Sequence, residues 1–209
     1  MRKIIKGNEP EQLTKWMRAN NKLRYGSLPP EERQSVRAAC IKEQFGLCAY
    51  CCQSISPKAA HNEHVESQDR APARTLDFTN IVASCESRTN CGHRRKTKRL
   101  DLTPFMDECE TELKFYLNGL VEGTTARAKA SIEALNLGHS EESNRGLIGR
   151  RRAMVEILIY DARLKPDELM QIEDKELLEM LAEELESPVA GNLQAFSPVL
   201  VNVIRQLLP

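Results

Sequence analysis

Apolar residues recur at every third or fourth position over most of the chain, which is the spacing of amphipathic helices. Prolines and a glycine mark where some of these helices begin and end: Pro10 and Pro30 suit first turns, and Gly46 suits a helix end. The predicted helices span residues 9–20, 30–45, 125–137, 140–163 and 166–185, and a last one opens at Ser197-Pro198 with Ser197 as its cap. The protein is therefore expected to be mostly helical.

The stretch 47–98 departs from this helical pattern until its end. Residues 61–66 and 78–84 can each form a short extended segment, and the polar residues 68–77 form a loop between them. The residues from Cys91 onward are polar and suit the start of a helix. The predicted order is strand, loop, strand, helix.

A hairpin is predicted at Asn118-Gly119, which lies between two apolar runs, because a two-residue turn of this kind needs positive φ. Residues 3–6 favour one further short strand. We therefore predict an α+β fold, in which a small ββα module is embedded in a mostly helical protein. The predicted parts are an N-terminal helical segment, a central module with the hairpin, and a C-terminal helical domain: 1–46, 47–123 and 124–209.

Composition limits the classes of function. The chain has 30 basic and 30 acidic residues and no net charge, which argues against a protein that coats nucleic acid without specificity. No apolar run is long enough to span a bilayer, and the opening residues lack the apolar core of a signal peptide. We expect a cytoplasmic protein, in which seven cysteines are more plausibly metal ligands or thiols than disulfides.

Two cysteine pairs bracket the central module. Cys48 and Cys51 have the two-residue gap that aims two thiolates at one ion, and Cys85 and Cys91 would complete the four sulfur ligands of a structural Zn²⁺. The wider second gap requires residues 86–90 to loop out. Cys52 is a spare thiol that can substitute for Cys51. The alternative is a set of buried, inert thiols, but this stretch has few apolar residues with which to offset chain entropy.

Polar residues suited to phosphodiester hydrolysis lie between and just after the cysteine pairs. His64 can activate a water, because imidazole titrates near neutrality. Glu63 precedes it, and His93 can offer a ring nitrogen to the same divalent ion as Glu63. Asn80 can organise a loop or orient His64 through hydrogen bonds. His61 remains open as a further ligand, a substrate contact or a solvated side chain.

The order His64, Asn80, His93, framed by the cysteines, resembles the HNH endonuclease family with its ββα-metal fold. The resemblance covers about 50 residues. It implies that His64 is the general base, that Glu63 and His93 bind the catalytic Mg²⁺ or Mn²⁺, and that Asn80 is an organiser, with DNA as the substrate.

A weaker resemblance extends along the chain. The segments IIKGNEPEQLTKW, NIVASCESRTNCGHRRK and SIEALNLGH, and the later GRRRAMV, are similar to the PtuB subunit of Septu and retron-linked anti-phage defence systems. This resemblance implies an ATPase partner of the PtuA kind.

A basic run follows His93 directly: Arg94, Arg95, Lys96 and Lys98. These side chains are expected to hold the phosphate backbone without reading bases. The rival hypothesis is a non-catalytic zinc-knuckle module that binds nucleic acid or a protein, which would share the cysteines but have no use for His64 beside Glu63. RNA as a substrate is a third possibility. The apolar tail 196–208 is expected to close the protein's own core rather than to dock on a partner.

Overall fold

Two small antiparallel sheets and a set of helices make up residues 1–161 and 175–208, the part of the chain that the computed structural model describes. The helices are α1 (Glu11–Ala19), α2 (Pro30–Glu43), α3 (Cys91–Arg95), α4 (Ala126–Leu135), α5 (Arg145–Asp161), α7 (Lys175–Glu186) and α8 (Ser197–Arg205). The strands are β1 (Ala60–His64), β2 (Ile81–Cys85), β3 (Leu113–Phe115) and β4 (Val121–Gly123). The predicted α+β class is confirmed.

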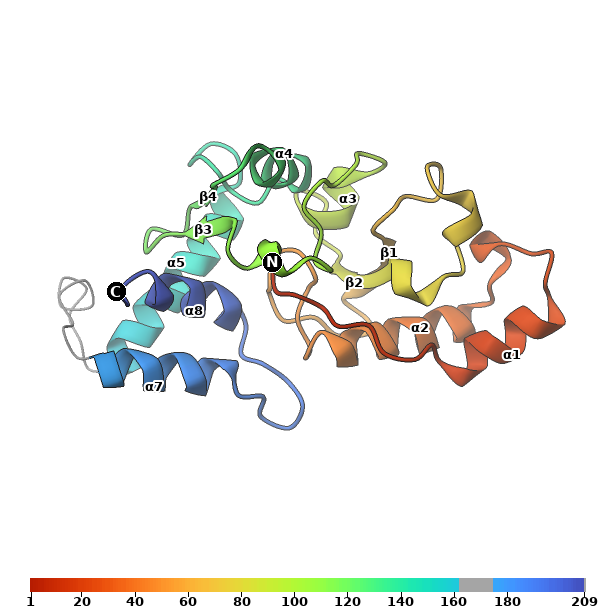
Figure 1. Ribbon diagram of the computed structural model, residues 1–209, viewed down its shortest axis with the longest axis horizontal. Coiled ribbons are helices and arrows are strands. Elements are labelled where there is room, and N and C mark those ends of the chain that lie inside the picture. The colour runs from red at the N-terminus through yellow and green to blue at the C-terminus, as the bar shows by residue number, and fades with distance from the viewer. Residues whose placement is uncertain (162–174, 209) are drawn as a thin grey trace.

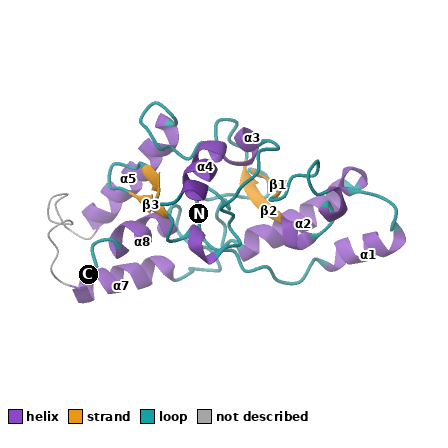
Figure 2. Ribbon diagram, turned by 45° about the horizontal axis from the view of Figure 1, so that its top comes forward, coloured by secondary structure: helices purple, strands orange, loops and turns teal. Residues whose placement is uncertain are grey.

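The molecule is elongated, with α1 and α2 at one end and α5, α7 and α8 at the other (Figure 1). The β1–β2 sheet lies between them, with α2 on one side and α3 on the other (Figure 2). Every residue of β2 is buried, because helices cover it on both sides. The described helices are too short or too polar to cross a membrane.

The start and end of α2 follow from local chemistry. Pro29 is extended and Pro30 takes the first helical position, where a missing N–H costs nothing. After the helix the chain reverses through Gly46, whose φ is +76°. This conformation favours glycine, and a Cβ at Gly46 would also lie 2.5 Å from Oδ1 of Asn192, so that the Asn192 side chain would have to shift.

The antiparallel register of β1 and β2 pairs Ala60 with Cys85 and His64 with Ile81. The second of the predicted extended segments begins as a short 3-10 turn, Phe78–Asn80, before β2 starts. The ββα order of the central module is therefore present as predicted.

The hairpin predicted at Asn118-Gly119 is present, because β3 and β4 pair antiparallel on either side of it. Its turn is longer than the two-residue turn expected: the Gly119 N–H donates to the Tyr116 carbonyl, and Asn118 does not have a positive φ. Gly119 has a φ of +84°, and a Cβ there would collide with the backbone carbonyl of Ile148 on α5. The turn therefore both reverses the chain and allows α5 to approach closely.

Two expectations were wrong. Residues 3–6 form no strand: Ile4 donates one backbone hydrogen bond to Pro104, and Lys6 pairs with Glu43 at 2.6 Å. Ser197 is not the cap of α8 but its first helical residue, because Phe196 precedes it in the left-handed conformation with φ +61°.

The predicted C-terminal helices are present where the structure describes them. The predicted helix 140–163 corresponds to α5, which begins five residues later, at Arg145. The end of the predicted helix 166–185 corresponds to α7, and residues 162–174 lie outside the described part of the chain.

One hydrophobic core joins the three predicted segments of the chain. It contains Ile4 from the first, Leu102 from the second, and Leu147 and Val199 from the third. The module's cysteines belong to the same core: Cys48, Cys51, Cys52, Cys85 and Cys91. A second cluster packs α1 and α2 against β2, and a third packs α7 and α8 together. The tail closes the protein's own core, as expected.

Candidate metal centre and active site

Four buried cysteines come together at one point, with their Sγ atoms all within 4.8 Å of one another: Cys48, Cys51, Cys85 and Cys91. The Cys48–Cys91 and Cys51–Cys85 sulfur distances are 3.8 and 4.0 Å. A tetrahedral zinc site with bonds of about 2.3 Å needs sulfur atoms about 3.8 Å apart. The donor set and its spacing therefore fit a structural Zn²⁺.

Each pair is positioned by a different piece of backbone. Cys48 and Cys51 lie in a tight turn after α2, which is closed by the backbone hydrogen bond from Cys52 to Cys48. Cys85 ends β2 and Cys91 begins α3, so the ion would tie the turn to both elements. Residues 86–90 loop out between β2 and α3, as the wide gap required.

Nitrogen donors surround the sulfur atoms. The amide of Asn90 donates to the Cys91 sulfur at 2.9 Å, and the backbone N–H of Cys85 donates to the Cys48 sulfur at 3.4 Å. Such donors stabilise metal-bound thiolates and orient them. Without a metal, burial raises the pKa of the Cys51 and Cys91 thiols. This role of Asn90 was not predicted from the sequence, although Asn90 directly precedes Cys91.

The other cysteines lie outside this cluster. Cys52 has a positive φ of 64° and its sulfur is not among the four that converge. Burial raises the pKa of Cys40 and of Cys109 to about 12, so both are inert core thiols. Cys51, rather than its neighbour Cys52, therefore completes the cluster of four cysteines that could hold an ion.

His64 ends β1 and is buried. Its Nε2 lies 2.8 Å from the carbonyl oxygen of Thr75, and its ring meets Tyr25 edge-on, with centroids 4.7 Å apart. Burial lowers the pKa of the imidazole below its ordinary value. A carbonyl can only accept, so Nε2 carries the proton and Nδ1 keeps its lone pair.

Asn80 closes the loop between β1 and β2. Its Oδ1 accepts from the backbone N–H of Glu66 at 2.8 Å, and its Nδ2 donates to the carbonyl of the same residue at 2.9 Å. Both termini of the loop that carries Thr75 are thereby held together. This geometry fits the organising role expected for Asn80, which holds the loop that carries Thr75, the hydrogen-bond partner of His64.

An open pocket of about 380 Å³ lies at the end of β1. Its polar lining comes from β1, the following loop and the end of α3: Asn62, Glu63, His64, Ser67, Gln68, Asp69, Arg95, Lys96 and Thr97. The pocket therefore joins the proposed base to part of the basic run.

Arg95 does not belong to the surface that was expected to hold phosphate. It is only 1% exposed, and its guanidinium pairs with Oε1 of Glu63 and donates to the carbonyl oxygens of Val65 and Lys98 at 2.9 and 3.1 Å. A buried guanidinium needs its donors satisfied inside the protein, and these partners satisfy them. Its expected role as a phosphate contact is corrected to a structural one.

The exposed part of the basic run consists of Arg94, Lys96 and Lys98. Arg94 lies on α3, which ends at Arg95, and Lys96 follows with a φ of +56°. The two lysines therefore leave the helix and lie on a turn, where Lys96 reaches the pocket wall.

His93 and Glu63 do not face each other as a simple ligand pair. Nε2 of His93 lies 2.8 Å from Oε2 of Glu86, and its ring packs on His61 with centroids 4.1 Å apart. Glu63 gives one oxygen to Arg95, while the other lies 3.6 Å from Nε2 of His61. The donors that converge on one point are His61, Glu86 and His93.

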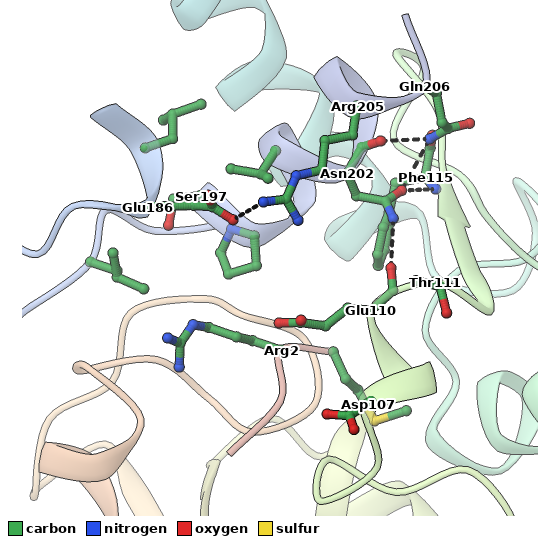
Figure 3. Close-up of a pocket in the computed structure, with 15 residues that line it drawn as sticks. Arg2, Asp107, Glu110, Thr111, Phe115, Glu186, Ser197, Asn202, Arg205 and Gln206 are labelled. Carbon is green, nitrogen blue, oxygen red and sulfur yellow. Dashed lines mark hydrogen bonds and ion pairs between the residues drawn. The ribbon is translucent and has the colours of Figure 1, made fainter. Parts of the chain in front are cut away.

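A larger pocket of about 630 Å³ lies elsewhere, between the N-terminal residues, β3 and α8 (Figure 3). Asn202 lies at its edge and joins α8 to β3: its Oδ1 accepts from Phe115 N–H at 2.9 Å, and its Nδ2 donates to the carbonyls of Glu110 and Leu113. The charged residues at this pocket are already paired in part, as Arg205 is with Glu186 at 2.6 Å. The residues around this pocket therefore mainly hold α8 against β3 and the residues that precede it.

No protein-family model and no curated protein matches this chain.

Proposed function

We propose that the protein is a metal-dependent endonuclease of the HNH type, in which a four-cysteine Zn²⁺ centre holds a ββα module. The observation that carries this proposal is the placement of His64. His64 is the last residue of β1 and is among the residues that line an open pocket, although it is only 6% exposed, and its Nε2 donates to the Thr75 carbonyl. A general base needs this combination of a fixed ring, a free lone pair and access to substrate.

His64 acts by accepting a proton at Nδ1 from the attacking water. The Thr75 carbonyl fixes the tautomer, and the ring of Tyr25 limits rotation of the imidazole. Once protonated, the imidazolium is stabilised by the same carbonyl, which accepts from Nε2 in both states. A divalent ion bound beside the module would take up the charge that develops on the phosphate and the leaving oxygen.

The exposed basic residues supply the substrate contacts. Lys96 lines the pocket, and Arg94 and Lys98 are exposed on α3 and shortly after it. They suit the phosphate backbone, which supports a nucleic-acid substrate without sequence preference. DNA is the substrate we propose, and RNA is the alternative that the cleavage assay separates.

A role in anti-phage defence, with an ATPase partner of the PtuA kind, rests on the resemblance to PtuB. The rival function is a non-catalytic zinc-knuckle module. The rival explains the four cysteines equally well, but it gives no reason for a histidine with a fixed tautomer at the wall of an open pocket.

A nicking assay tests the proposal. The purified protein is incubated with supercoiled plasmid, single-stranded DNA and RNA in the presence of Mg²⁺, Mn²⁺ or EDTA. We expect metal-dependent cleavage that is lost in His64→Ala and in His64→Gln, while the zinc content and melting temperature of at least one variant match the wild type. His139→Ala is the control, because His139 is exposed and outside the module.

Cleavage by a folded His64 variant at the wild-type rate would overturn the assignment of the base. Nucleic-acid binding by the wild type without cleavage under any of the metals would favour the zinc-knuckle function.

A further inference from the structure

A second cluster of metal-ligating side chains lies on the outer side of the module. It consists of His61 on β1, Glu86 directly after β2, and His93 on α3, with one ligand atom from each within 4.8 Å of the others. The side chains of Glu86 and His93 are 48% and 40% exposed, so water and ions reach these two donors, whereas the His61 side chain is 21% exposed. The three elements of the ββα unit thus contribute one donor each.

The two nitrogens of His61 have different surroundings. Nδ1 is buried and has no hydrogen-bond partner, and it lies 3.5 Å from Oε1 of Glu86. Nε2 lies 3.6 Å from Oε2 of Glu63, whose other oxygen is held by Arg95. At 3.6 Å this is an electrostatic contact rather than a hydrogen bond, and a small shift would give the usual arrangement at a metal centre, in which a histidine presents one nitrogen to the ion and the other to a carboxylate.

We propose that His61 Nδ1, a carboxylate oxygen of Glu86 and His93 Nε2 bind a divalent transition-metal ion. Glu63, which the sequence had suggested as a ligand, acts behind the site by orienting His61. The donor set of two imidazoles and one carboxylate suits Zn²⁺, Co²⁺ or Mn²⁺ better than Mg²⁺, which prefers oxygen. Three protein ligands leave a fourth position open.

The four-cysteine cluster would fix the backbone positions of two of the three donors. Glu86 follows Cys85 directly, and His93 lies two residues after Cys91, so the Zn²⁺ that fixes the cysteines also fixes the backbone of two donors. Gly92 allows the third donor, His61, to approach α3, because a Cβ at residue 92 would lie 2.8 Å from Nε2 of His61 and 2.7 Å from Oε2 of Glu63. Small rotations of the exposed side chains bring the donors to the roughly 3.3 Å separation that bonds of about 2.0–2.1 Å require.

The inference concerns ion binding and does not rest on the proposed cleavage of nucleic acid. Its test uses the full chain, treated with EDTA at a concentration that leaves one Zn²⁺ per chain. Co²⁺ is then titrated and followed by its visible d–d bands and by calorimetry. We expect one further equivalent to bind, without the near-ultraviolet thiolate-to-cobalt band that a cysteine site would produce.

Removal of a donor should weaken this second binding event by about tenfold or more, as the loss of even an outer partner does at known sites. We expect that result for Glu86→Gln and His93→Ala, with one Zn²⁺ per chain retained as the evidence of folding. His139→Ala is the matched control and should bind Co²⁺ as the wild type does, because His139 is exposed and outside the cluster.

Three results would overturn the proposal. The first is the absence of Co²⁺ binding beyond the resident Zn²⁺, and the second is a thiolate band that places the Co²⁺ among the cysteines. The third is unchanged Co²⁺ affinity in both Glu86→Gln and His93→Ala.

Discussion

Arg95 and Arg94 are neighbours of the same type with opposite environments. Arg95 is buried against Glu63 and three backbone carbonyls, whereas Arg94 is exposed. We expect Arg95→Met to reduce the free energy of unfolding by about 3–5 kcal/mol, because it leaves the Glu63 carboxylate buried without its partner. Urea unfolding of the full chain measures this change.

Arg94→Met is the control for that experiment and should change the free energy of unfolding by about 0.5 kcal/mol or less, as is usual for surface substitutions. Equal stability of the two variants would contradict the structural role of Arg95. The sequence predicted four similar basic residues here. It could not separate them, because a helix of five residues is too short for a periodic pattern to identify its buried side.

Lys96 is the basic residue that remains exposed at the pocket. We expect Lys96→Glu to weaken DNA binding and to reduce the slope of log K against log salt by about one, since each neutralised phosphate contributes roughly 0.9 to that slope. Fluorescence anisotropy over a range of salt concentrations provides the measurement. Lys15→Glu on α1, which is also exposed, should leave the slope unchanged; equal slopes for wild type and Lys96→Glu would remove this residue from the interface.

At the scale of elements, the module depends on the cysteine turn more than on its own short strands. The β1–β2 sheet has two strands, and such a pair is marginal in water without further support. A structural Zn²⁺ contributes about 10–16 kcal/mol in small finger peptides. The ion would join the turn after α2 to the end of β2 and the start of α3, which are far apart in sequence.

Cys51 and Cys52 provide a matched pair for testing this dependence. We expect Cys51→Ser to lose the bound Zn²⁺ and the amide protection of β2, whereas Cys52→Ser retains one Zn²⁺ per chain. Elemental analysis and hydrogen exchange measure the two quantities. The reverse outcome would show that Cys52 is the ligand. The sequence left this choice open, because both residues follow Cys48 at plausible spacing and only the path of the turn separates them.

The order of the module's elements could be predicted from the sequence, but the partners of its polar residues could not. The cysteine pairs, the hairpin at Asn118-Gly119 and the strand–loop–strand–helix order depend on local spacing, which one sequence contains. Glu86 lies in a loop whose path depends on where the four cysteines meet. Its position beside His61 and His93 is therefore a tertiary result that no local pattern indicates.

At the scale of the whole molecule, the C-terminal segment is bound to the cysteine turn rather than set apart from it. The backbone N–H of Phe196 donates to the carbonyl of Cys52 at 2.8 Å, and that of Leu193 donates to the carbonyl of Phe45 at 2.9 Å. Phe196 is buried in the same core as the four clustered cysteines. A boundary near residue 124 therefore separates stretches of sequence that share one core.

This shared core predicts cooperative unfolding. We expect Phe196→Ala to lower the free energy of unfolding by about 3–5 kcal/mol, the usual effect of removing a buried aromatic ring. Because the core is common, zinc release and loss of helical circular dichroism should shift together to lower urea concentration. Val189→Ala is the control, since Val189 is 79% exposed, and it should shift neither transition. Helix loss in Phe196→Ala that precedes zinc release as a separate transition would instead show that residues 124–209 unfold as an independent domain.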